Sequence, residues 1–133
     1  PYARALCAAA LARIDLAEAI FAAWTGPKGR RRAAVRDRVL PAAGRNARAM
    51  EAFAAAFRTM WRMHNRPQGM ETTQIRLAGA LERAHEAILR FEEFAAGEVP
   101  TIPELDDLAK VGFKPELAGP RSWARVAHAT VIA

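Results

Sequence analysis

Hydrophobic residues recur at intervals of three and four along most of the first hundred positions, which is the spacing of one face of an α-helix. The clearest series predicts the strongest core stripe of the chain. It consists of Met50, Phe53, Phe57, Met60, Trp61 and His64. Two further stripes, each typical of one apolar helix face, consist of Tyr2, Leu6, Ile14, Ala17, Phe21 and Trp24, and of Leu77, Leu81, Ala84, Ile88, Phe91 and Ala95.

Glycine and proline mark the ends of the predicted helices. The long helices are predicted at 2–24, 30–64 and 71–96. Proline lacks a backbone donor and clashes with the preceding turn, so Pro41 predicts a kink in the second helix, and Gly44 would permit a full break. The predicted fold class is all-α, with three long helices packed as an antiparallel bundle, the second one kinked near Pro41.

The last part of the chain departs from this pattern. A short helix is predicted at 102–110, and 122–132 has the character of an extended tail. A lone strand has no partner in a helical chain, so we expect the partner of this tail elsewhere. The length of 133 residues fits a single helical domain over 1–133, and a first residue other than methionine predicts a fragment of a longer protein.

Charge and composition narrow the classes of function. Arginine outnumbers lysine 17 to three, and residues 1–70 hold 13 basic and four acidic residues, against seven and ten in residues 71–133. A basic first half and an acidic second half can neutralise each other's charge within one bundle. No stretch approaches the ~20 apolar residues of a membrane span. The single cysteine, Cys7, fits a core position and a reducing compartment, so we expect a cytoplasmic protein.

The sequence predicts no catalytic residue, no metal site and no cofactor. The three histidines lack metal-ligand spacing. The adjacent acids Glu92–Glu93 and Asp106–Asp107 point about 100° apart on a helix, so the two members of a pair cannot hold one substrate atom together. The sequence also contains no glycine-rich phosphate loop and no nucleophile elbow.

A basic cluster at 28–38 points to a different class of function. It could bind phosphates, but no aromatic residue is interleaved and no recognition-helix motif accompanies it, which disfavours nucleic acid. Three arginines near a helix N-terminus oppose the helix dipole, so we expect acids from another element nearby. The alternative function is a free-standing basic helical module that uses Arg30–Arg38 to bind nucleic acid or an acidic protein.

Three segments together carry a resemblance to a known family. They are Trp-Arg-Met-His-Asn-Arg-Pro-Gln-Gly-Met-Glu at 61–71, Ile-Arg-Leu-Ala-Gly-Ala-Leu at 75–81, and the stretch from Arg-Phe-Glu-Glu-Phe to Ile-Pro-Glu-Leu at 90–105. This series resembles the C-terminal helical region of bacterial β-N-acetylhexosaminidases of glycoside hydrolase family 20. Residues 122–132 are more weakly similar to the final segment of those proteins.

The resemblance implies a role beside an enzyme rather than an enzymatic reaction. In that family the reaction takes place on a (β/α)₈ barrel, where a neighbouring Asp and Glu orient the acetamido group and protonate the leaving oxygen. This chain contains no Asp-Glu dipeptide. The expected function is therefore that of a non-catalytic accessory domain, whose partner is the catalytic barrel of the same polypeptide.

The corner between the second and third predicted helices is the candidate interdomain site. Its residues are Trp61, Arg62, Asn65, Arg66, Pro67 and Gly69. Proline and glycine fix the turn, the Asn65 amide can cap it, and the Trp61 N–H lies at its edge. Two interpretations stay open: the two arginines reach acids on the barrel, or Trp61 is the last core layer and the arginines are solvated.

Overall fold

A computed structural model describes residues 1–66 and 68–106 of the chain, which divides into two compact units, Pro1–Ile102 and Pro103–Ala133. The four α-helices of the first unit are α1 (Tyr2–Thr25), α2 (Arg31–Ala34), α3 (Leu40–His64) and α4 (Glu71–Ala96). The described residues include no strand, and the all-α fold class is confirmed. Residues 103–106 of the second unit are helical, whereas 107–110 and the predicted tail at 122–132 lie outside the described residues.

The chain stays helical from residue 28 to residue 64. A 3₁₀ turn, η1 (Lys28–Arg30), leads into α2, and a π-helical segment, η2 (Val35–Val39), joins α2 to α3. Pro41 lies in the first turn of α3, directly after η2. The wider π turn makes room for the proline ring, which would clash with the carbonyl of Asp37 in a regular α-helix. The irregularity thus precedes the proline, and the helix continues through Gly44 without a full break.

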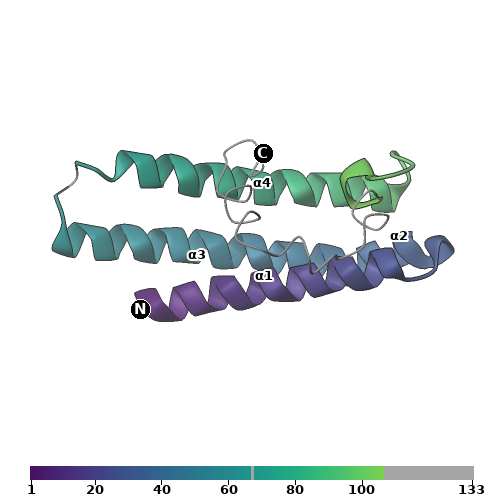
Figure 1. Ribbon diagram of the computed structural model, residues 1–133, viewed down its shortest axis with the longest axis horizontal. Helices are drawn as coiled ribbons and strands as arrows, with labels where there is room; N and C mark the ends of the chain where they lie inside the picture. The colour runs from purple at the N-terminus through teal and green to yellow at the C-terminus, as the bar shows by residue number, and fades with distance from the viewer. Residues whose placement is uncertain (67, 107–133) are drawn as a thin grey trace, which may run out of the picture. The chain divides into compact units, whose positions relative to one another are not determined.

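Helix α3 packs against both α1 and α4 (Figure 1). The Tyr2 ring of α1 lies 5.8 Å from that of Phe53 and 6.0 Å from that of Phe57 in α3, while the other end of α1 reaches η2. In α4, the imidazole of His85 lies 3.2 Å from the carboxylate of Glu51 in α3. Each long helix therefore runs antiparallel to its neighbour along the chain.

Small side chains set the contact between α1 and α3. The inner seam of α1, defined as the residues of its α3-facing side, is half-buried or buried and consists of Ala5, Ala9, Ala12, Leu16, Ala19 and Ala23. Helix α3 has buried alanines at Ala42, Ala43, Ala47 and Ala54, of which Ala54 lines a cavity on its α4 side. The distance between packed helices depends on the side chains at the contact, so alanines on both sides let the two backbones approach closely.

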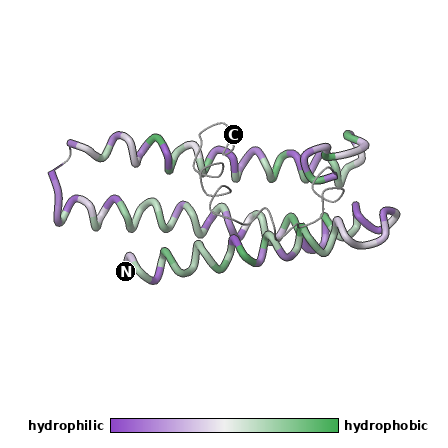
Figure 2. The backbone as a smooth tube through the Cα atoms, viewed as in Figure 1, coloured by the Kyte–Doolittle hydropathy of each residue, from purple (hydrophilic) through white to green (hydrophobic). Residues whose placement is uncertain are grey.

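The predicted buried face of α1 is wrong for most of its residues. Trp24 is buried, but Leu6, Ile14 and Phe21 are 43%, 54% and 67% exposed, and Cys7 is exposed as well. Hydrophobic residues occur all along α1 (Figure 2), and their spacing in the sequence gives the helix more than one apolar side. The alanine side faces α3 because bulky side chains would hold the two helices apart.

Most of the deeply buried large side chains lie at the η2 end of the bundle. Val35 and Val39 are fully buried, and Trp24, Phe91 and Phe94 are nearly so. The α3 stripe that was predicted as the strongest core is only half-buried from Met50 to Trp61, and His64 at its end is exposed. The outcome differs because α1 begins at Tyr2, beside Phe53 and Phe57, and a shallow cavity lies between this part of α3 and α4, so the stripe is covered incompletely.

Overpacking a buried position of α3 should destabilise the bundle. Ala43 is 2% exposed, and Ala43→Leu should lower the free energy of unfolding by about 1–3 kcal/mol because the added methyl groups force the helices apart. Ala52→Leu, at an exposed position of the same helix, is the matched control and should change it by less than about 0.5 kcal/mol. Urea denaturation measures both, and equal effects would contradict close packing at Ala43.

Candidate functional site

The corner between α3 and α4 is closed by the Trp61 indole. Its N–H donates to the carbonyl of Arg66 over 3.0 Å, and its ring lies 5.9 Å from the ring of Phe57. Asn65 ends α3 through its backbone N–H, which donates to the carbonyl of Trp61 over 2.8 Å. The tryptophan is therefore both the last half-buried aromatic residue of α3 and the clamp that holds the chain as it leaves the helix.

Glycine and an acid complete the corner on the α4 side. Gly69 has a φ of 92°, and its N–H donates to the side chain of Glu71 over 2.8 Å. Glu71 is the first residue of α4, where a negative charge is favourable to the helix dipole. Met70, between them, is buried. Of the predicted corner residues, Pro67 lies outside the described residues.

The charged residues of the corner point away from the bundle core. Arg62, Asn65 and Arg66 are exposed, as is Gln68. The structure thus places the described corner residues at one end of the bundle and leaves the two guanidinium groups accessible. An exposed pair of arginines fits a surface that meets acidic groups, and it fits a solvated helix end equally well.

Arginines of the basic cluster at 28–38 contact the ends of α1 and α4, which the sequence did not indicate. Arg31 donates from Nη2 to the carbonyl of Trp24 over 3.2 Å, and its guanidinium lies 5.2 Å from the centre of the Trp24 ring. Arg32 lies over the Phe94 ring at 5.6 Å, and Arg36 reaches the carbonyl of Ala95 at 3.5 Å. We call Arg31, Arg32 and Arg36 the arginine clasp, because they join the ends of α1 and α4 to the start of the second helical stretch.

The arginine clasp shows that groups other than acids also stabilise these positive charges. Trp24 and Ala95 lie in the last turns of α1 and α4, where helix carbonyls carry partial negative charge. Neither helix has a basic residue in its own last turn. The arginines are unfavourable to the N-terminus of their own helix but favourable to the C-termini of two others, and aromatic faces add cation–π attraction.

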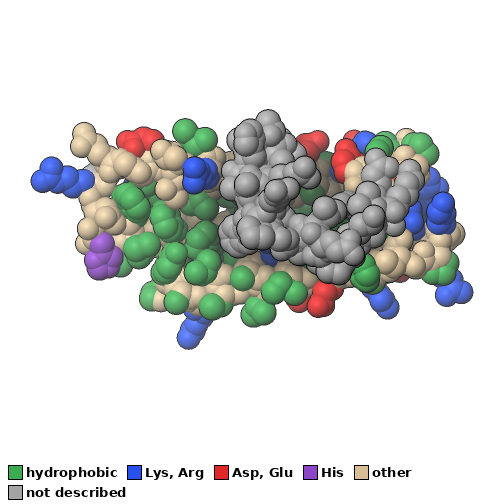
Figure 3. Space-filling model, in the orientation of Figure 1, with side chains coloured by type: hydrophobic (Ala, Val, Ile, Leu, Met, Phe, Trp, Pro, Cys, Tyr) green, Lys and Arg blue, Asp and Glu red, His purple; other side chains and the backbone are tan. Residues whose placement is uncertain are grey.

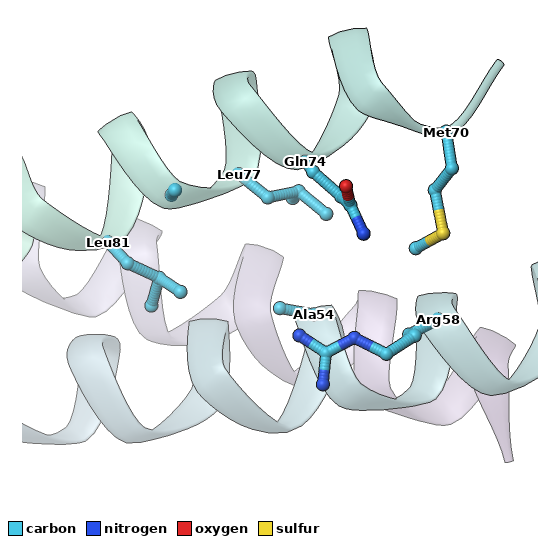
Figure 4. Close-up of a pocket in the computed structure, with 7 residues that line it drawn as sticks. Ala54, Arg58, Met70, Gln74, Leu77 and Leu81 are labelled. Carbon is cyan, nitrogen blue, oxygen red and sulfur yellow. The ribbon is translucent and has the colours of Figure 1, made fainter. Parts of the chain in front are cut away.

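A shallow cavity of about 210 Å³ lies between α3 and α4. Figure 4 shows Leu77 and Leu81 of α4, and Met70 just before that helix, pointing toward α3, and the Arg58 side chain extending from α3. The lining is Ala54, Arg58, Met70, Gln74, Leu77, Ala78 and Leu81. The volume is below the ~300 Å³ at which small-molecule sites begin. Within the described residues, no group of three His, Cys, Asp or Glu is placed to hold a metal ion.

A family model described as Glycoside Hydrolase 20C C-terminal domain matches residues 8–118. The chain belongs to this glycoside hydrolase family of C-terminal domains. The match begins inside α1 and covers α2, α3 and α4, and it confirms the resemblance drawn from the corner and the segments after it. No curated protein and no solved structure matches the chain.

Membership in the glycoside hydrolase 20C C-terminal domain family implies a catalytic domain in the same polypeptide. In the described part of the chain, no helix combines the length and the apolar character that a membrane span requires. The arginine clasp is the feature of this family member that sequence reasoning missed. Backbone carbonyls of a distant last turn have no residue signature, so the partners of the three arginines could not be found from spacing.

Removing a clasp arginine should destabilise the bundle. Arg31→Ala removes one charge-assisted hydrogen bond and one cation–π contact with Trp24, and we expect a loss of about 1–2 kcal/mol in the free energy of unfolding. Arg30→Ala, at the exposed neighbouring position, should cost less than about 0.5 kcal/mol. Thermal unfolding followed by circular dichroism compares them, and a silent Arg31→Ala would contradict the clasp.

The corner glycine and a helical glycine should respond with opposite signs. Gly69→Ala places a side chain at a φ of 92°, which should cost about 1–2 kcal/mol. Gly79→Ala in the interior of α4 adds a Cβ whose nearest neighbour is an Arg83 nitrogen at 3.8 Å, and it should stabilise by about 0.5–1 kcal/mol. Denaturant midpoints measure both, and a shift of the same sign in the two variants would contradict the corner geometry.

Proposed function

We propose that this domain is a non-catalytic helical accessory domain of a β-N-acetylhexosaminidase-like family 20 glycoside hydrolase, and that it packs against and supports the catalytic barrel of the same polypeptide. The observation that carries the proposal is the family match over residues 8–118. A bundle of this kind contributes surface and stability rather than chemistry. Its role, which involves no contact with substrate, is to cover and stabilise a neighbouring domain.

The alternative of a free-standing basic module is not favoured. Such a module needs its Arg30–Arg38 cluster free to neutralise phosphates or acids. Arg31, Arg32 and Arg36 instead contact rings and carbonyls at the ends of α1 and α4. These contacts engage three of the cluster's five arginines, which leaves fewer guanidinium groups for an outside partner. Retention on a phosphate-rich column should accordingly be weak and depend little on salt.

The corner is proposed as one of the contacts with the barrel. Arg62 and Arg66 are exposed, and the Trp61 N–H donates to the carbonyl of Arg66. Exposed guanidinium groups at one end of the bundle can pair with carboxylates of a facing surface through two parallel hydrogen bonds.

If this domain supports the catalytic domain, then removing it should lower the stability of the catalytic domain. In the full-length hydrolase, deletion of residues 8–118 should lower the melting temperature of the catalytic domain by several degrees, and Arg62→Glu should give part of that shift because it repels acids on the barrel. The matched control is Arg76→Glu on α4, an exposed position away from the corner. Differential scanning calorimetry of the four proteins measures the effect.

Two results would count against the proposed function. An unchanged melting temperature after the deletion would remove the supporting role altogether. Hydrolysis of an aryl N-acetyl-β-glucosaminide by the C-terminal domain alone would contradict its non-catalytic nature. If the deletion destabilises the catalytic domain but Arg62→Glu matches Arg76→Glu, the supporting role stands and the corner is not its contact.

A further inference from the structure

Helix α1 has a second apolar seam on the side away from α3. The outer seam, as we name it, consists of Ala3, Cys7, Ala10, Ile14, Ala17 and Phe21. It has the same alternating spacing of four and three residues as the inner seam, and the two sets are two positions apart. Because successive residues of an α-helix turn by about 100°, the two seams point about 200° apart and lie on opposite sides of α1.

The outer seam is exposed and carries no charge. Ile14 and Phe21 are 54% and 67% exposed, Cys7 is exposed, and the flanking Leu6 and Leu11 are exposed too. Hydrophobic side chains are visible along the free edge of α1 in Figure 3. The charged residues of α1 follow its borders: Arg13 lies on one side, and Arg4, Asp15 and Glu18 lie on the other. An apolar centre with a charged rim is the usual anatomy of a protein interface.

We propose that the outer seam is the docking surface for the catalytic domain of the same polypeptide, which presents an α-helix to it. This inference rests on the proposed function and names the surface through which it acts. The alternation of four and three residues is the spacing that fits one helix against another. On the inner side the structure satisfies that spacing with α3, and the outer side repeats it with larger side chains at Ile14 and Phe21.

The position of α1 in the polypeptide favours the catalytic domain over other occupants. The family match begins at Ala8, inside α1, and a C-terminal domain follows its catalytic domain along the chain. The chain that leaves the catalytic domain therefore enters this domain through α1. A covalently linked partner acts at an effective concentration that reaches millimolar values for a short linker, so it can be held by a modest surface.

The size of the outer seam argues against a second copy of the chain. A stable complex between separate proteins buries about 800 Å² on each partner. Half of the outer seam is alanine, and its large side chains are Ile14 and Phe21. A single helix face of this composition is a narrow surface for a diffusing partner. It suits a tethered one, in which a few large side chains act as anchors.

The thiol of Cys7 lies in the outer seam and reports directly on whether it is covered. In the full-length hydrolase, we expect Cys7 to be alkylated by iodoacetamide at least tenfold more slowly in the wild type than in the double variant Ile14→Glu/Phe21→Glu. Mass spectrometry of the peptide that contains Cys7 gives the rate. The added glutamates disfavour the thiolate, so faster alkylation in the variant cannot arise from their charge.

The matched control places the same substitutions at equally exposed apolar positions on α4. Ile75 and Leu89 are 74% and 54% exposed, and Ile75→Glu/Leu89→Glu should leave Cys7 as slow as in the wild type. The milder variant Phe21→Ser should accelerate alkylation in the same direction as the double variant. Circular dichroism shows that each protein keeps its helices, and Phe21→Ser provides the test if the double variant does not fold.

Two outcomes overturn the inference. The first is equal alkylation of Cys7 in the wild type, Phe21→Ser and the double variant. The second is protection that disappears on dilution while light scattering shows a dimer becoming a monomer, which assigns the outer seam to a second copy. The proposed function fails separately: if Cys7 reacts fast but deletion of residues 8–118 still destabilises the catalytic domain, the supporting role stands and acts through another surface.

Discussion

The Trp24 indole determines where three helices meet. Its ring lies 6.4 Å from the ring of Phe91 and 5.8 Å from that of Phe94. The Arg31 guanidinium lies over the indole and donates to the backbone carbonyl of Trp24. Burial of such an aromatic cluster contributes several kcal/mol, which is a large part of the stability of a small domain. From this end, α1 and α4 extend along α3, so the positions of the corner and of the outer seam both depend on it.

The arginine clasp and the alanine contact stabilise different parts of the bundle. The clasp places cations at the C-terminal ends of α1 and α4, where the helix dipoles favour them. Alanines along the inner seam then allow α1 to lie close to α3, and dispersion contacts accumulate over the whole length of the helix. Three arginines thus make contacts within the bundle, while the larger apolar side chains Ile14 and Phe21 of α1 stay exposed.

Two exposed surfaces of the bundle are available to a neighbouring domain. The corner presents Arg62 and Arg66, and the outer seam presents Ile14 and Phe21. The ring of Tyr2, in the first turn of α1, contacts Phe57, whose ring contacts Trp61. These ring contacts join the start of α1 to the corner, so a domain that covers the outer seam near its start also lies close to the two arginines.

The sequence by itself determined the helical class and the corner, because the periodicity of hydrophobic residues and the glycine at 69 act locally on the backbone. It also carried the family resemblance. The tertiary structure alone decided which face of α1 is buried. An alanine-rich helix with two seams has no local preference between them, and the choice follows from how closely α3 can approach. Tertiary structure likewise decided the role of the arginines, since their partners are backbone carbonyls and rings brought near only by folding.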